Sequence, residues 1–179
     1  MPLSLTVVHR SVAIPLALWS LTLGGLGPSA ESSAHETSSW VRSESPIVLS
    51  AIAIATERSA TFRRLIESIE STDGLIYIIE GQCPREVPAC LHLWIGTAGR
   101  RRLLRISVNP RRSPGCQMVE LLAHELQHAM EALSHKKVRT SPSLYLLFAR
   151  IGPTASGTFE TQDALDMGAA VAREACGKS

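Results

Sequence analysis

The sequence contains few aromatic residues, little net charge and no pair of cysteines in a C-x-x-C arrangement. Aromatic residues make up 4% of the chain, so the side chains that stack on nucleic-acid bases are scarce. The formal net charge of +2 indicates no particular affinity for nucleic acid or for an anionic membrane. The absence of a C-x-x-C pair disfavours a zinc site built from cysteines. The chain also has no internal repeat and no low-complexity tract.

The amino end has the layout of a secretory signal peptide. The chain has 179 residues, enough for one domain with a core. Residues 1–10 contain one arginine and no acid, and residues 11–27 are apolar and end in glycines. A small, polar stretch follows at residues 28–39, with cleavage sites predicted after Ala30 or Ala34.

A retained membrane anchor is the alternative interpretation of this leader. The apolar run is short for a membrane span and is interrupted by Pro15, Ser20 and Thr22. We therefore expect export to a secreted or periplasmic location, with no stable membrane span after cleavage. Residues 1–34 are assigned to the leader and residues 35–46 to a flexible segment, and a single domain is expected over residues 47–179.

Four cysteines follow the leader, an even number that suits an oxidising compartment. Cys83 and Cys90 bracket a proline-containing loop that can close as a small ring. Cys116 can then pair with Cys176. Four cysteines allow three connectivities, so this pairing is a hypothesis.

Hydrophobic periodicity predicts an α+β domain. A helix is expected over residues 47–71, ended by a Thr-Asp-Gly turn signal. Strands are expected at residues 75–79, 91–95 and 104–108. Further helices are expected at residues 119–133, 144–151 and 159–176. The order predicts a small, three-stranded, mainly antiparallel sheet covered by helices.

The helix at residues 119–133 contains an H-E-x-x-H motif, formed by His124, Glu125 and His128. Two histidines four residues apart lie on one face of a helix, which is the spacing that two imidazoles need to bind one zinc ion. The intervening glutamate of such a motif is turned towards the site of the metal and its water.

A third protein ligand is needed, and two glutamates are candidates. Glu160 shares a stripe with Ala164 and Gly168 if residues 159–176 are helical, and a buried carboxylate is costly unless it is paired or binds metal. Glu131 lies one turn beyond His128, but three ligands along one straight helix would span about 10 Å. Glu160 is therefore preferred, and Glu131 is kept as the alternative or as a residue that orients a ligand.

On these residues the chain resembles the gluzincin branch of the zincin metallopeptidases. The resemblance implies a zincin-like fold in which Zn²⁺ is bound by His124, His128 and a C-terminal helix carrying Glu160. It also implies that Glu125 is the general base that acts on a zinc-activated water to hydrolyse a peptide or protein substrate. Tyr145, between motif and third ligand, is a candidate hydrogen-bond donor to the transition state. The alternative function is a noncatalytic exported module that keeps this fold.

Overall fold

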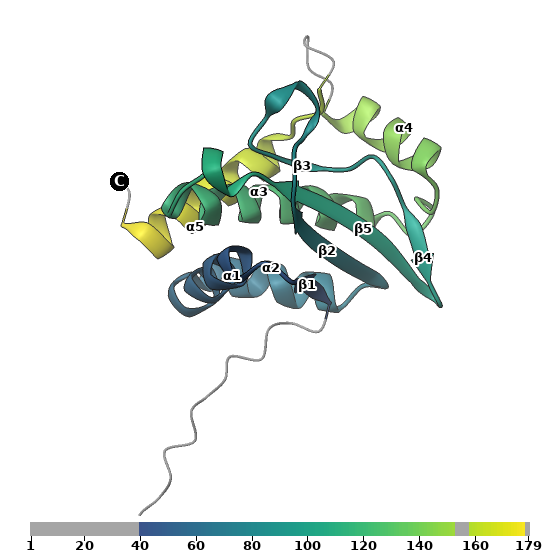
Figure 1. The fold of residues 1–179 in the computed structure, drawn as a ribbon. Coiled ribbons are helices and arrows are strands. Elements are labelled where there is room, and N and C mark those ends of the chain that lie inside the picture. Colours follow the sequence, from purple (N-terminus) through teal and green to yellow (C-terminus); the bar gives the residue numbers. More distant parts are fainter. Residues whose placement is uncertain (1–39, 153–157, 178–179) are drawn as a thin grey trace, which may run out of the picture. The chain divides into compact units, whose positions relative to one another are not determined.

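A mixed sheet forms one layer of the domain, and helices cover one of its faces (Figure 1). The computed structural model describes residues 40–152 and 158–177. Within them lie five strands, namely β1 (Val41–Ser43), β2 (Gly74–Glu80), β3 (Ala89–Leu91), β4 (Gly96–Ala98) and β5 (Arg101–Val108). The strand order is β1-β2-β5-β3, and β4 also pairs with β5. The pairs β1–β2 and β2–β5 are parallel, whereas β3 and β4 run antiparallel to β5.

The expectation of a three-stranded, mainly antiparallel sheet is therefore wrong. Alternation along a strand is the same for parallel and antiparallel pairs, so it carries no information on direction. The strand predicted at residues 91–95 is also wrong in its bounds, because only Leu91 lies in β3 and residues 92–95 form the connection to β4, which begins at Gly96. Residues 41–43, expected within a flexible segment, form β1, and Val41 is buried against the core.

One face of the sheet carries the core and the other is partly open to solvent. Ile76 and Ile78 of β2, and Leu104 and Ile106 of β5, are fully buried. On the opposite face of β2, Ile79 is 39% exposed. Helices therefore cover only one face of the apolar strand β2.

Five helices lie in the described ranges: α1 (Pro46–Arg58), α2 (Ala60–Glu70), α3 (Cys116–Ser134), α4 (Ser141–Ile151) and α5 (Gln162–Cys176). The single helix expected over residues 47–71 is divided at Ser59, which has an extended backbone. Ser59 accepts a hydrogen bond from the Phe62 amide at 3.0 Å and so caps α2.

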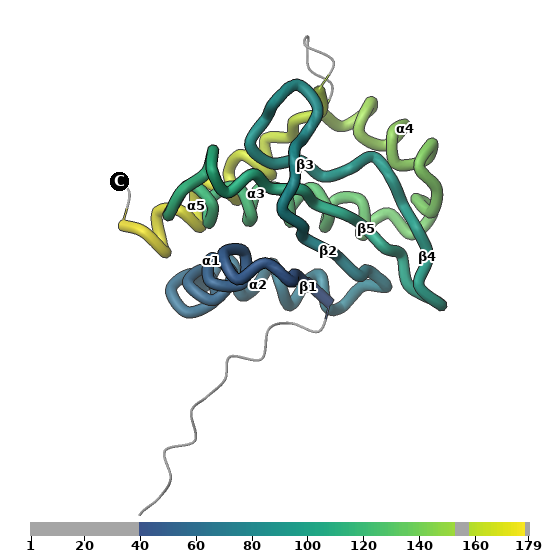
Figure 2. Tube along the Cα trace, viewed as in Figure 1, coloured from purple at the N-terminus to yellow at the C-terminus, as the bar shows by residue number. Residues whose placement is uncertain are grey.

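Helix α3, which carries the motif, is the central helix of the core. It contacts α1, α2 and α5, as well as β3 and β5, and α5 runs beside it (Figure 2). Its apolar residues recur at helical spacing and form one buried face, since Val119, Leu122, Leu126, Ala129 and Leu133 are at most 2% exposed. The motif is therefore held on a helix that packing fixes on several sides.

Arg102 of β5 secures the carboxyl end of α3. It is 1% exposed and forms an ion pair with Asp73. Its guanidinium donates hydrogen bonds at 2.6 to 3.1 Å to the backbone carbonyls of Ala132, Leu133, His135 and Val138. Carbonyl groups at a helix end lack partners within the helix, and a buried cation there also complements the helix dipole.

Two disulfides join Cys83 to Cys90 and Cys116 to Cys176, which confirms the proposed pairing. They indicate an oxidising, extracytoplasmic environment. No helix within the described residues is long and apolar enough to cross a membrane. The predicted leader at residues 1–34 lies outside the described residues, all of which belong to the unit Ala34–Ser179.

Candidate metal centre

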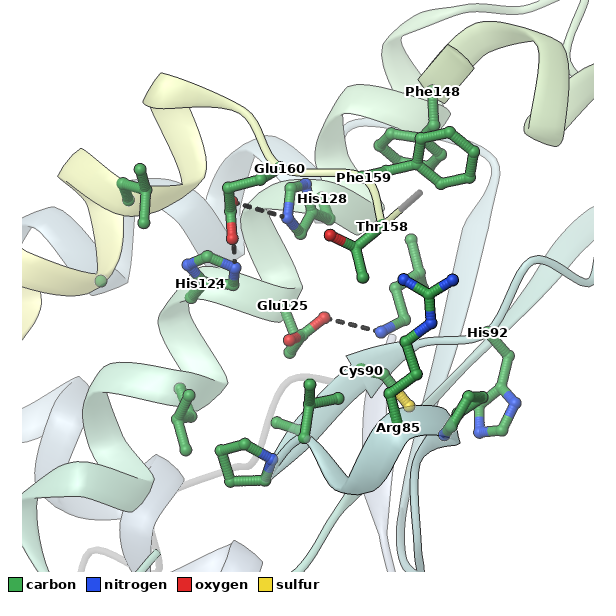
Figure 3. A pocket seen from close by; sticks show the side chains of 18 of the residues that line it. Arg85, Cys90, His92, His124, Glu125, His128, Phe148, Thr158, Phe159 and Glu160 are labelled. Carbon is green, nitrogen blue, oxygen red and sulfur yellow. Dashed lines mark hydrogen bonds and ion pairs between the residues drawn. The ribbon is translucent and has the colours of Figure 1, made fainter. Parts of the chain in front are cut away.

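A pocket of about 740 Å³ opens between the motif helix, β3 and the segment that precedes α5. Its volume falls in the range of small-molecule and peptide side-chain sites, about 300–1,000 Å³. His124, Glu125 and His128 line it from α3, and Glu160 lines it from the other side of the histidines (Figure 3). The sequence-predicted motif residues and the preferred third residue thus meet in one place.

His124, His128 and Glu160 form a group that could hold a metal ion. Oε1 of Glu160 lies 3.4 Å from Nε2 of His124 and 3.4 Å from Nε2 of His128. All three candidate ligand atoms lie within 4.8 Å of one another. Ligands bound about 2.05 Å from a tetrahedral zinc ion are about 3.3 Å apart, so the two distances to Glu160 fit such a site. Two imidazoles and one carboxylate are also a donor set that zinc accepts.

Glu131 holds His128 from the side that faces away from Glu160. Its Oε2 lies 2.9 Å from Nδ1 of His128, and its Oε1 accepts a hydrogen bond from the Thr161 hydroxyl at 2.6 Å. With Nδ1 donating to a carboxylate, the lone pair of His128 is left on Nε2, which faces Glu160. Glu131 therefore contacts the histidine from outside the group rather than joining the three clustered atoms.

Thr161 links this arrangement to α5. Its hydroxyl accepts a hydrogen bond from the Ala164 amide at 3.2 Å and caps the helix. Its own amide donates to Oε1 of Glu160 at 3.0 Å. One residue thus starts α5, positions Glu160 and contacts Glu131, a role that sequence reasoning missed although threonine is a common N-cap.

The electrostatic surroundings of the two histidines differ. Burial and the neighbouring His128 lower the pKa of His124, which favours the neutral imidazole that a metal requires. Burial also acts to lower the pKa of His128, but the hydrogen bond to Glu131 and the nearby carboxylates outweigh it, so the pKa is raised. His128 therefore holds a proton more readily than His124 does, and the negative charge that favours this proton would also attract a cation.

Glu125 is the buried acid of the pocket. It is 5% exposed, and burial raises its pKa to about 7. Its Oε2 accepts a hydrogen bond from the Leu91 amide at 2.6 Å, which anchors the carboxylate to β3. A carboxyl group whose pKa is close to neutral can both accept and return a proton at physiological pH.

Glu160 does not lie on the last helix as expected. That helix begins at Gln162 rather than at Phe159, so Glu160 is in the segment before the cap. The Glu160 amide donates to the Gly152 carbonyl at 2.8 Å, and the Phe159 ring stacks on Phe148. The prediction that Glu160 lies on a helical stripe is therefore wrong, because the apolar spacing begins before Thr161, the residue that caps the helix.

Gly168 allows α5 to lie directly against the turn of α3 that carries His124. A Cβ at this position would lie 3.1 Å from the Glu120 carbonyl oxygen and 3.3 Å from Cβ of His124. Such contacts are tighter than ordinary van der Waals packing. His124 also donates a ring N–H to the backbone carbonyl of Ala164 in α5. Helix α5 therefore supports both histidines of the candidate metal centre, His124 directly and His128 through Thr161 and Glu131.

Tyr145 is not among the residues that line the pocket. It is 52% exposed on α4, and its ring contacts Phe159 edge-on with the centroids 5.4 Å apart. The structure therefore does not bring Tyr145 together with the histidines and Glu160. His92 does line the pocket, where its Nε2 lies 2.7 Å from the Ser107 hydroxyl.

Comparison of the chain with protein-family models, with curated proteins and with solved structures finds no match.

Proposed function

We propose that this protein is an exported, zinc-dependent metallopeptidase. The observation that carries the proposal is that His124, His128 and Glu160 cluster beside the buried Glu125 in one pocket. The first three residues would hold the ion. When bound, zinc polarises a carbonyl group and makes a water molecule a better nucleophile at neutral pH.

Glu125 is assigned the proton transfers. One of its oxygens is held by the Leu91 amide, so the carboxylate keeps one orientation towards the pocket. It would take a proton from the attacking water and return it to the leaving amine. Burial of Glu125 strengthens its charge interactions because water is excluded.

The test separates metal binding from hydrolysis. We expect Glu125→Gln to retain zinc and the wild-type fold, because glutamine keeps the shape and the hydrogen bond to Leu91. Hydrolysis of a broad peptide library, followed by mass spectrometry, should fall by at least about a hundredfold, the usual contribution of a general base. Glu57→Gln, an exposed glutamate of α1, is the matched control and should keep full activity.

Three outcomes contradict the proposal. If the zinc-loaded wild type cleaves no peptide, the alternative of a noncatalytic exported module is favoured. If Glu125→Gln cleaves as fast as the wild type, Glu125 is not the base. A wild type that binds no zinc by metal analysis would remove the metal centre itself.

A further inference from the structure

The loop closed by the disulfide Cys83–Cys90 forms a wall of the pocket across from the metal-site histidines. Pro84, Arg85 and Val87 of this loop line the pocket. The loop leads directly into β3, which pairs with β5 and whose Leu91 amide holds Glu125. The disulfide joins the two ends of the loop, and β3 connects the loop to the sheet and to Glu125.

Arg85 has an unusual backbone conformation in this loop. Its φ is 57° and ψ is 21°, and the following residue, Glu86, has a φ of 56°. Residues other than glycine rarely adopt this left-handed region, and they persist there only when the surrounding structure imposes it. The Arg85 side chain lines the pocket that contains Glu125, with its guanidinium group on the side away from His124 (Figure 3).

Arg85 is the only arginine or lysine among the described residues that line the pocket. The other charged groups on its walls are carboxylates, namely Glu120, Glu125 and Glu160. Apolar side chains such as Leu93 and Leu121 also line it. The pocket therefore offers a metal-binding group on one side, an apolar surface, and one guanidinium group on the other side.

We propose that Arg85 binds a carboxylate group of the peptide substrate and so determines specificity. A guanidinium group pairs with a carboxylate through two parallel hydrogen bonds, which is a geometry that lysine cannot reproduce. This inference rests on the proposed peptidase function, since it places the carboxylate near the bond to be cleaved. The carboxylate can come from the carboxyl terminus of a peptide or from an aspartate or glutamate side chain.

Binding is measured separately from hydrolysis. The zinc-loaded Glu125→Gln protein is titrated against fluorescent peptides of one sequence, and fluorescence anisotropy gives the Kd. One peptide has a free terminal carboxylate, a second is amidated, and a third is amidated with an internal glutamate in place of glutamine. We expect at least one carboxylate peptide to bind about tenfold more tightly than the neutral one.

Substitution of Arg85 in the same background tests the assignment. Arg85→Gln should remove this preference while changing the Kd of the neutral peptide by less than about twofold, and Arg85→Lys should keep only part of it. Arg111→Gln, an exposed arginine that does not line the pocket, is the control and should keep the preference. Equal Kd values for all three peptides, or a preference that survives Arg85→Gln, would overturn the proposal.

The wild-type protein then separates the sources and the two proposals. Release of the terminal residues from the free peptide alone indicates the terminal carboxylate, whereas cleavage of the amidated glutamate peptide indicates the side chain. Cleavage without any carboxylate preference leaves the peptidase proposal intact and refutes the role of Arg85. A preference in binding without any cleavage refutes the peptidase proposal instead.

Discussion

Replacement of Glu131 tests how the candidate metal centre is built. Glu131 is 10% exposed, and its two oxygens contact Nδ1 of His128 and the Thr161 hydroxyl. Glu131→Ala removes the group that holds the His128 ring and breaks the link to α5. Loss of such an outer partner lowers metal affinity about 10- to 100-fold. That change equals about 1.4 to 2.7 kcal/mol of binding free energy.

The order of effects distinguishes a ligand from a residue that orients one. Glu160→Ala removes one of the three clustered ligand atoms and should weaken zinc binding more than Glu131→Ala does. Glu131→Gln can still accept the Thr161 hydrogen bond but lacks the charge, so its effect should be smaller than that of alanine. Asp166→Ala, an exposed acid of α5, is the control and should bind as the wild type does.

Zinc affinity is measured at neutral pH by competition with a chromophoric chelator, and circular dichroism checks that each variant is folded. A larger loss for Glu131→Ala than for Glu160→Ala would make Glu131 the ligand and refute the arrangement described above. Unchanged affinity in Glu131→Ala would show that packing alone orients His128.

Two further predictions concern stability. Arg102→Met leaves several buried carbonyls at the end of α3 without a donor. It should lower the free energy of unfolding, measured by urea titration, by about 3–5 kcal/mol. The control Arg100→Met, at an exposed position, should change it by less than about 0.5 kcal/mol. Glu174 accepts hydrogen bonds from Thr61 and Ser59, which lower its pKa to about 2 from 4.5. Because the folded state favours the carboxylate, this stabilisation is complete above pH 4.5 and is lost as the pH falls towards 2. The difference in Tm between Glu174→Gln and the wild type should therefore shrink over that range, and a difference independent of pH would contradict it.

Features that depend on local spacing could be predicted from the sequence. The apolar face of α3 follows from positions such as Leu122 and Leu126, which recur at helical intervals and are buried. Cys83 and Cys90 are separated by only seven positions, so their ring was a short-range prediction. The clustering of the motif histidines on one face follows from the helix itself.

Features that depend on contacts between distant segments could not be predicted in this way. Ser59 interrupts the first helical segment because its hydroxyl caps α2 and donates to Glu174, 115 residues further along the chain. The direction of β2 relative to β5 depends on how the chain crosses between them, and the alternation of apolar and polar residues along a strand carries no information on it. The left-handed backbone of Arg85 has no glycine or asparagine to indicate it.

Glu160 shows how a correct residue can be reached through an incorrect structure. Apolar spacing places it on a helix, yet Thr161 caps that helix one residue later, and Glu160 lies outside it. The position before the cap is better suited to a ligand, because the side chain is not confined to the helix surface and the Thr161 amide steadies it at 3.0 Å. The same threonine contacts Glu131, which contacts His128. The start of α5 therefore controls both the carboxylate and one imidazole, so a change that shifts this helix start should disturb the whole metal centre even when all three candidate ligands are kept.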